Sequence, residues 1–107
     1  YQLAQRRAEC PRPPDKPHLR IFVQDAAGRG QPGQIIWVTW AEGLDRFVTG
    51  LRPEIDPGYG DFEMQPDQTY NVSIGRSDRV DVGELQAVPC AGNGLTSWRL
   101  TLRSAAP

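Results

Sequence analysis

Apolar and polar residues alternate along several short segments of the chain. In residues 19–24, Leu19, Ile21 and Val23 fall on one side of an extended backbone, which is the pattern of a half-buried strand. The same alternation recurs in residues 59–64, 69–74 and 98–103. Each of these segments is therefore predicted to be a β-strand with one face toward a core.

Other segments carry weaker strand signals. Residues 35–40 form a β-branched and aromatic run that is too short for a typical helix, and residues 45–49 make a less regular strand. Residues 81–88 hold only scattered apolar positions, so we expect a short edge strand there. No segment has a sustained period of 3.6 residues, and the pattern therefore predicts an all-β chain, an antiparallel sandwich of about seven strands.

The inward positions of these strands define the predicted core. They share an apolar side chain and the spacing of two that places alternate residues on one face of a strand. The predicted core residues are Leu19, Ile21, Val23, Ile36, Val38, Trp40, Phe62, Met64, Tyr70, Val72, Ile74, Trp98, Leu100 and Leu102.

The same register places three large apolar residues on the outside. If Ile36 and Val38 face the core, alternation turns Ile35 and Trp37 outward, and Phe22 turns outward in its own strand. One interpretation is that a linker or a neighbouring domain covers Trp37. The other is that Trp37, Phe22 and Ile35 form an aromatic patch that stacks on a sugar ring or grips a partner.

The composition limits the chain to one domain. Its 107 residues have 38% hydrophobic character, and 11 glycines and 10 prolines imply many turns. The chain begins at Tyr1 rather than Met, so we expect a mature or excised part of a longer protein. We assign residues 1–18 to a Pro-rich linker, 19–104 to the sandwich and 105–107 to a tail.

The charge pattern narrows the class of partner. The net charge is −1 and the basic residues are scattered, with only Arg99 and Arg103 lining up on the last strand. This distribution argues against nucleic acid, which requires a concentrated basic surface. No apolar run approaches the roughly 20 residues of a membrane-spanning helix, so no membrane span is expected.

The two cysteines, Cys10 and Cys90, are expected to form a disulfide. Cys10 lies in a polar segment that is poorly suited to bury a free thiol, although two buried thiols are the alternative. A bond that closes a loop of this length stabilises a fold by roughly 4 kcal/mol in the chain-entropy model. A disulfide implies an oxidising compartment, and a structural zinc site lacks ligands because the chain has one histidine.

Three candidate catalytic or cofactor motifs have simpler explanations. The spacing G-x-G-x-x-G at residues 28–33 matches a dinucleotide-binding loop, but a strand follows where that loop requires a helix. His18 as a catalytic base is far less expected than a surface histidine. The pair Asp61 and Glu63 fits the solvated face of a strand better than a glycosidase site. We therefore expect no enzyme activity and no cofactor.

Calcium is a weaker option at the long loop over residues 50–60. Acidic residues flank this loop, and carboxylate oxygens are the ligands that calcium prefers. No D-x-D-x-D-G loop is present, so a metal site is not expected. The candidate ligands are Asp45, Glu54, Asp56 and Asp61.

Six segments between residues 21 and 74 form a pattern that is found in a known family. They are Val-Gln-Asp25, Gly-Arg-Gly-Gln-Pro-Gly33, Ile-Ile-Trp-Val-Thr-Trp40, Phe-Val-Thr-Gly50, Gly-Tyr-Gly-Asp-Phe62 and Gln-Thr-Tyr-Asn-Val72. This arrangement resembles carboxypeptidase regulatory-like domains, which are transthyretin-like, or prealbumin-like, sandwiches, and it implies a sandwich of the immunoglobulin-like or prealbumin-like type. The chain departs from the family pattern at Gln68-Thr69, where a Gly is common, and in its longer loop from Gly50 to Gly58.

The resemblance implies a class of role and no catalytic residue. Such domains are appended to secreted bacterial enzymes and cell-surface proteins, where they serve as spacers, folding aids or binding modules. We therefore expect a secreted or cell-surface accessory domain that binds polysaccharide or cell-wall glycan through Trp37, Phe22 and Ile35. A structural spacer, or a domain that docks to neighbouring domains of the parent chain, is the alternative.

Overall fold

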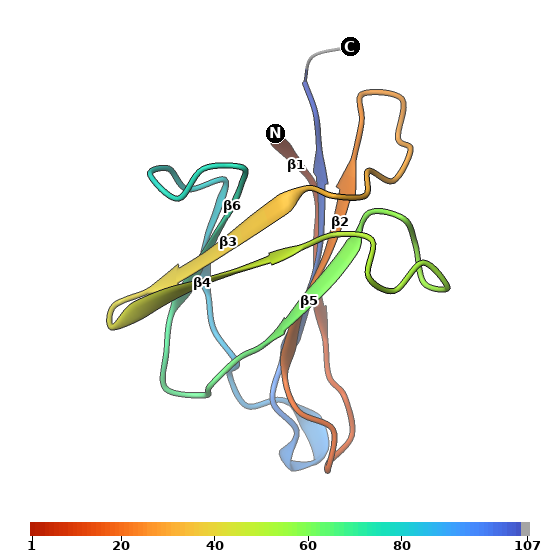
Figure 1. Cartoon of the computed structure of the whole chain (residues 1–107). Coiled ribbons are helices and arrows are strands. Elements are labelled where there is room, and N and C mark those ends of the chain that lie inside the picture. Colours follow the sequence, from red (N-terminus) through yellow and green to blue (C-terminus); the bar gives the residue numbers. More distant parts are fainter. Residues whose placement is uncertain (106–107) are drawn as a thin grey trace.

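A computed structural model describes residues 1–105 and is all-β, with eight strands and one short 3₁₀ turn (Figure 1). One strand more is present than the sequence pattern predicted. The elements are β1 (Gln2–Glu9), β2 (His18–Gln24), β3 (Ile35–Trp40), β4 (Gly43–Val48), β5 (Tyr59–Glu63), β6 (Tyr70–Ile74), β7 (Val82–Leu85), η1 (Ala91–Asn93) and β8 (Ser97–Arg103).

The strands form two four-stranded sheets, in the orders β1-β8-β2-β5 and β4-β3-β6-β7. We call them the first and the second sheet. They pack face to face as a sandwich, which confirms the predicted fold class (Figure 1). Neighbouring strands are antiparallel except β2 and β8, which run parallel because β8 enters the sheet between β1 and β2.

The sequence pattern predicted a linker over residues 1–18, but part of this segment is a strand. Residues Gln2–Glu9 form β1, which pairs with the whole length of β8. Arg6 fixes this edge by donating to the carbonyls of Gly83 and Glu84 at 3.0 and 3.1 Å. The prediction missed β1 because its side chains are nearly all exposed, so the strand has no apolar alternation.

The core lies between the two sheets and contains most of the predicted residues. The buried members are between 0% and 2% exposed and come from β2, β3, β6 and β8, together with Met64. Val82, Leu85 and Ala87 are also buried, so the weak segment near residue 82 contributes to the core as β7. The confirmed core residues are Leu19, Ile21, Val23, Ile36, Val38, Met64, Tyr70, Val72, Ile74, Leu100 and Leu102.

The predicted core residues Trp40, Phe62 and Trp98 are only partly buried and pack against the core from its margin. Trp40 and Phe62 belong to an aromatic cluster with Tyr70, with ring centroids 5.5 to 5.8 Å apart. Phe47 extends this cluster by stacking on Phe62 at 6.4 Å. The cluster closes the sandwich where the second sheet ends at β4 and the first ends at β5.

The disulfide between Cys10 and Cys90 is present, with the two Cα atoms 6.0 Å apart. It ties the end of β1 to the segment that precedes β8, across 80 residues of sequence. The prediction is therefore confirmed. Because β1 and β8 already pair, the disulfide adds a covalent link beyond the Glu9–Ser97 end of this strand pair.

The glycine-rich segment over residues 28–33 forms turns between two strands, as expected from its context. Gly28 and Gly33 have φ values of +84° and +73°, which other residues rarely adopt. Asp25 holds the first turn because its carboxylate accepts hydrogen bonds from the backbone N–H groups of Ala27 and Arg29. These glycines therefore serve the backbone geometry of the connection.

After β8, the described chain continues to residue 105, and residues 106–107 of the expected tail lie outside the described residues. Across residues 1–105, no helix is long and apolar enough to cross a membrane.

Candidate functional site

The three residues predicted to form one patch lie on opposite faces of the molecule. Phe22 is on β2 of the first sheet, whereas Ile35 and Trp37 are on β3 of the second sheet. All three point away from the core, because their sequence neighbours Ile21 and Ile36 are fully buried. Outward residues of two packed sheets face away from each other, so the single patch of the sequence analysis is wrong.

Phe22 is also not an exposed platform. It is 8% exposed, because the Arg99 guanidinium lies 4.3 Å from its ring centroid and the Tyr59 ring packs beside it at 5.0 Å. Both neighbours come from strands adjacent to β2, namely β8 and β5. Arg99 therefore covers the face of the Phe22 ring that a ligand would contact, and a ligand reaches this face only if Arg99 moves away.

Trp37 is half-buried on the outer face of the second sheet. Its cross-strand neighbour on β4 is Arg46, whose guanidinium lies over the indole ring at 5.4 Å from the centroid. The indole N–H is buried and has no hydrogen-bond acceptor among residues 1–105. A buried donor without a partner costs about 1–3 kcal/mol, so this position is not optimised for stability alone.

Exposed hydrophobic side chains surround Trp37 along β3 and β4. Ile35 and its cross-strand neighbour Val48 are 36% and 37% exposed, and Leu44 is 59% exposed. Leu51, which follows β4, is 75% exposed and joins Ile35 and Val48 around a hollow of about 400 Å³. We call this surface the β3–β4 patch, and it consists of Ile35, Trp37, Leu44, Val48 and Leu51 with Arg46 between them.

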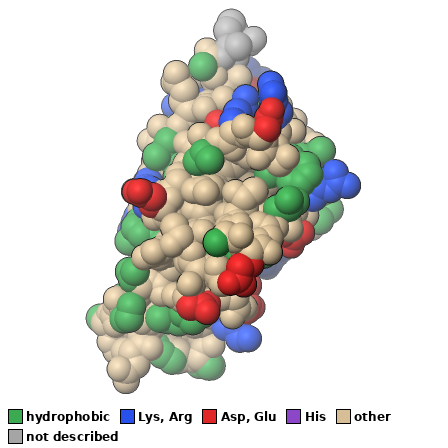
Figure 2. All heavy atoms as spheres, turned by 90° about the vertical axis from the view of Figure 1, so that its left-hand side faces the viewer, with side chains coloured by type: hydrophobic (Ala, Val, Ile, Leu, Met, Phe, Trp, Pro, Cys, Tyr) green, Lys and Arg blue, Asp and Glu red, His purple; other side chains and the backbone are tan. Residues whose placement is uncertain are grey.

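Figure 2 views the molecule from the side that is on the left in Figure 1. Hydrophobic side chains appear there in several groups separated by backbone and polar atoms, and acidic side chains are scattered over the upper, left and lower parts of this face. Leu44 and Leu51 were not among the predicted site residues, since Leu44 lies just outside the predicted strand over residues 45–49 and Leu51 lies in a Pro- and Gly-rich loop. The alternation of Leu44, Arg46 and Val48 was the available signal.

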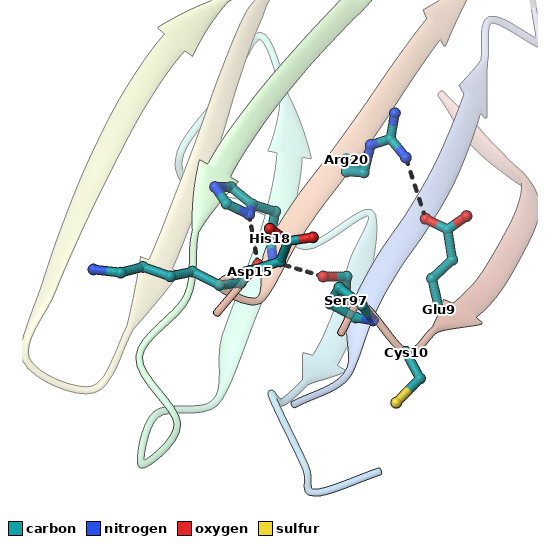
Figure 3. A pocket seen from close by; sticks show the side chains of 8 residues that line it. Glu9, Cys10, Asp15, His18, Arg20 and Ser97 are labelled. Atoms are coloured by element: carbon teal, nitrogen blue, oxygen red, sulfur yellow. Dashed lines mark hydrogen bonds and ion pairs between the residues drawn. The ribbon is translucent and has the colours of Figure 1, made fainter. Parts of the chain in front are cut away.

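A second hollow, of about 420 Å³, lies at the end of the first sheet (Figure 3). Its lining residues include His18, which was considered as a catalytic base, and Ser97. The Ser97 hydroxyl accepts from the backbone N–H of His18 at 2.9 Å, and the imidazole Nδ1 lies 2.8 Å from the Lys16 carbonyl. The imidazole is thus engaged by its own loop, and the arrangement of a serine nucleophile on a histidine base is not seen here.

The two carboxylates considered for glycoside hydrolysis have separate partners. Asp61 accepts a hydrogen bond from the Tyr59 hydroxyl at 2.8 Å and lies 3.9 Å from Arg52. Glu63 pairs with Lys16 at 3.7 Å. Both residues lie on the outer margin of β5, and neither lines the hollow of Figure 3.

The acidic residues considered for calcium are also held by local partners. Glu54 accepts from Arg52 at 3.2 Å, Asp56 accepts from the Gly58 N–H at 2.8 Å, and Asp45 accepts from the Arg46 N–H at 2.8 Å. Within residues 1–105, no three His, Cys, Asp or Glu side chains are placed to hold a metal ion.

Tyr59 and Arg20 form the electrostatically perturbed part of the first sheet. Burial raises the pKa of the Tyr59 phenol, and the hydrogen bond to Asp61 acts in the same direction, whereas Arg20 opposes both. Arg20 donates to the Tyr59 hydroxyl at 3.3 Å and pairs with Glu9 at 3.5 Å. The hydrogen bond with Tyr59 is the main reason that the pKa of Arg20 is raised.

Comparison of the chain with protein-family models, with curated proteins and with solved structures finds no match in any of the three. A function for this chain is therefore inferred from its residues and their geometry.

Proposed function

We propose that this chain is a non-catalytic accessory domain of a larger extracellular protein, and that it binds through the β3–β4 patch. The observation that carries the proposal is the group of four hydrophobic side chains, 36% to 75% exposed, that lie around Trp37 and Arg46. Exposed apolar groups that are clustered on one face commonly mark an interaction surface.

The disulfide supports the extracellular part of the proposal. A bond between Cys10 and Cys90 persists in oxidising compartments and is rare in a reducing cytosol. The resemblance to carboxypeptidase regulatory-like domains supports the accessory part, because those sandwiches are appended to secreted and cell-surface proteins.

The geometry favours a protein surface as the occupant of the patch, and in the first place a neighbouring domain of the parent chain. Leu44, Val48 and Leu51 offer aliphatic side chains, which pack on apolar protein surface. Arg46 stacked on Trp37 combines two residue types that are enriched at interface centres. β4 is an edge strand, so no further strand of the described chain lies beside the patch at that edge of the sheet.

Glycan or cell-wall binding at the same face is the second candidate. Trp37 is the observation in its favour, because an indole ring on the outside of a sheet is the usual group that stacks on a sugar. Arg46 lies over the ring, so this candidate requires the exposed Arg46 side chain to swing aside.

Matched variants distinguish the two candidates. In the docking version, the double variant Leu44→Ser, Leu51→Ser loses association with the adjoining domain of the parent protein, whereas Val80→Ser, at a 56% exposed position outside the patch, does not. In the glycan version, Trp37→Ala abolishes retention on insoluble polysaccharide or cell-wall material, with little change in melting temperature. Full association and retention in all patch variants would refute the proposed binding face.

A further inference from the structure

The outer face of the first sheet carries three arginines in a row across three neighbouring strands. Arg7 on β1 lies directly opposite Arg99 on β8, and Arg99 lies directly opposite Arg20 on β2. Opposite residues of paired strands point to the same side, and Arg99 and Arg20 point away from the core because Leu100 and Ile21 are fully buried. The sequence did not reveal this row, since Arg7 was assigned to a linker.

Such an arrangement is unfavourable for the isolated domain. Like charges placed directly opposite each other on paired strands destabilise a sheet, and here two consecutive pairs repeat the repulsion. Acidic residues offset it only at one end. Arg20 has Glu9 at 3.5 Å (Figure 3), whereas in the described chain no carboxylate lies within ion-pair distance of Arg7 or Arg99.

Two of the three guanidinium groups are held in place. Arg99 stacks on the Phe22 ring at 4.3 Å, and Arg20 is bound by the Tyr59 hydroxyl and by Glu9. A group that is ordered before binding loses less conformational entropy when a ligand arrives. The burial of Phe22 and Tyr59 is thus explained: these rings support the arginines and do not contact the ligand themselves.

From this row we infer that the outer face of the first sheet binds a linear polysaccharide of carboxylated sugars. Neighbouring strands are about 4.8 Å apart, so Arg7 and Arg20, two strands apart, are separated by about 9.6 Å. This is close to the length of two sugar rings, and in an extended glycan whose successive rings turn to alternate sides, the carboxylates of every second ring face the sheet at that spacing. Guanidinium groups bind carboxylates with charge-assisted hydrogen bonds. The exposed amide of Gln5, two residues before Arg7 on β1, supplies a neutral group for sugar hydroxyls.

The same observations disfavour other polyanions. Single-stranded nucleic acid needs exposed aromatic rings for its bases, and Phe22 and Tyr59 are 8% and 3% exposed. An extended acidic peptide presents same-side groups about 6.8 Å apart, twice the rise per residue. A peptide that crosses the strands to reach all three arginines also gains no backbone pairing with β8 or β2, because both are central strands with neighbours on both sides.

The inference concerns a surface on the opposite side from the β3–β4 patch, so either proposal stands or fails alone. The test measures binding of the whole chain to polygalacturonate by titration calorimetry at low ionic strength, with neutral dextran as the comparison. We expect binding to polygalacturonate only, and a loss of about tenfold or more in affinity for the double variant Arg7→Gln, Arg99→Gln. Arg76→Gln, at an exposed position that follows β6 in the second sheet, is the charge-matched control for the single variant Arg7→Gln and retains full affinity.

Three results would overturn the inference. The first is no binding of the unaltered chain, and the second is an equal loss in Arg76→Gln, which would indicate unspecific attraction. The third is equally tight binding of single-stranded DNA or polyglutamate that is lost in the same double variant. The single variant Arg7→Gln, on an exposed edge strand, keeps the test valid if the double variant is poorly folded.

Discussion

The guanidinium of Arg46 lies over the indole ring of Trp37, 5.4 Å from the ring centroid, on the outer face of the second sheet. The two residues are directly opposite each other on β4 and β3. This contact determines how much of the indole a ligand meets. The position of Arg46 therefore distinguishes the two candidate functions: with Arg46 on the ring the face is suited to protein docking, and with Arg46 moved aside the ring is free to stack on a sugar.

Removing the Arg46 side chain is expected to expose Trp37. In Arg46→Ala, quenching of tryptophan fluorescence by acrylamide should rise, and the rise should vanish when Trp37→Phe is added, because Trp40 and Trp98 pack against the core. Loss of an exposed cation–π contact should change stability by only about 0.5–1 kcal/mol. Unchanged quenching would show that Arg46 does not cover the ring.

Loss of the disulfide is expected to destabilise the domain without changing its fold. Cys10→Ser with Cys90→Ser should lower the free energy of unfolding by about 2–4 kcal/mol, because the bond closes a loop across 80 residues of sequence. Urea unfolding of the two forms measures the difference. Intact mass with and without reductant provides the control, and two free thiols in the untreated protein would contradict the bond.

Phe62 tests the packing of the aromatic cluster. Phe62→Ala removes ring contacts with Trp40 and Tyr70 from a partly buried position, so we expect a cost of about 2–3 kcal/mol, below the 3–5 kcal/mol of a fully buried phenylalanine. Leu100→Ala, at a 0% exposed position, serves as the reference for the core. A cost below about 1 kcal/mol for Phe62→Ala would indicate a different register for β5.

The raised pKa of Tyr59 leads us to expect a loss of stability at high pH. Its folded pKa is raised above the ordinary value of 10.0, mainly by burial, so the folded state holds its phenol proton more tightly than the unfolded state. The contribution of this phenol to the free energy of unfolding is fully present below pH 10.0, and it is lost as the pH rises from there through the folded pKa. Urea midpoints measured across this range should fall less steeply in Tyr59→Phe, and equal slopes would contradict the raised pKa.

The strands with one buried and one exposed face were predictable from the sequence. Leu19, Ile21 and Val23 alternate with polar or outward residues, so the period of two was visible and their burial followed. β1 was not predictable in this way, because a strand exposed on nearly every residue has no such period. Its position depends on pairing with β8, which lies about 90 residues further along the chain.

The candidate sites depend on which strands belong to the same sheet. Alternation correctly turned both Phe22 and Trp37 outward, but it did not indicate that β2 and β3 lie in different sheets. The arginine row has the same origin, since Arg7, Arg20 and Arg99 are distant in sequence and meet only through strand order. Local patterns give the direction of a side chain, and the topology gives its neighbours.

Hydroxyl-radical footprinting of the β3–β4 patch tests the central claim most directly. Leu44 and Leu51, 59% and 75% exposed, should be labelled readily in the isolated domain, and Val80 and Val88, 56% and 43% exposed, are internal controls outside the patch. In the intact parent protein, or on a polysaccharide whose retention depends on Trp37, labelling of Leu44 and Leu51 should fall several-fold while the two valines stay unchanged. A binding role for this face would be contradicted if the labelling of Leu44 and Leu51, relative to that of the two valines, were the same in the isolated domain and in each of these states.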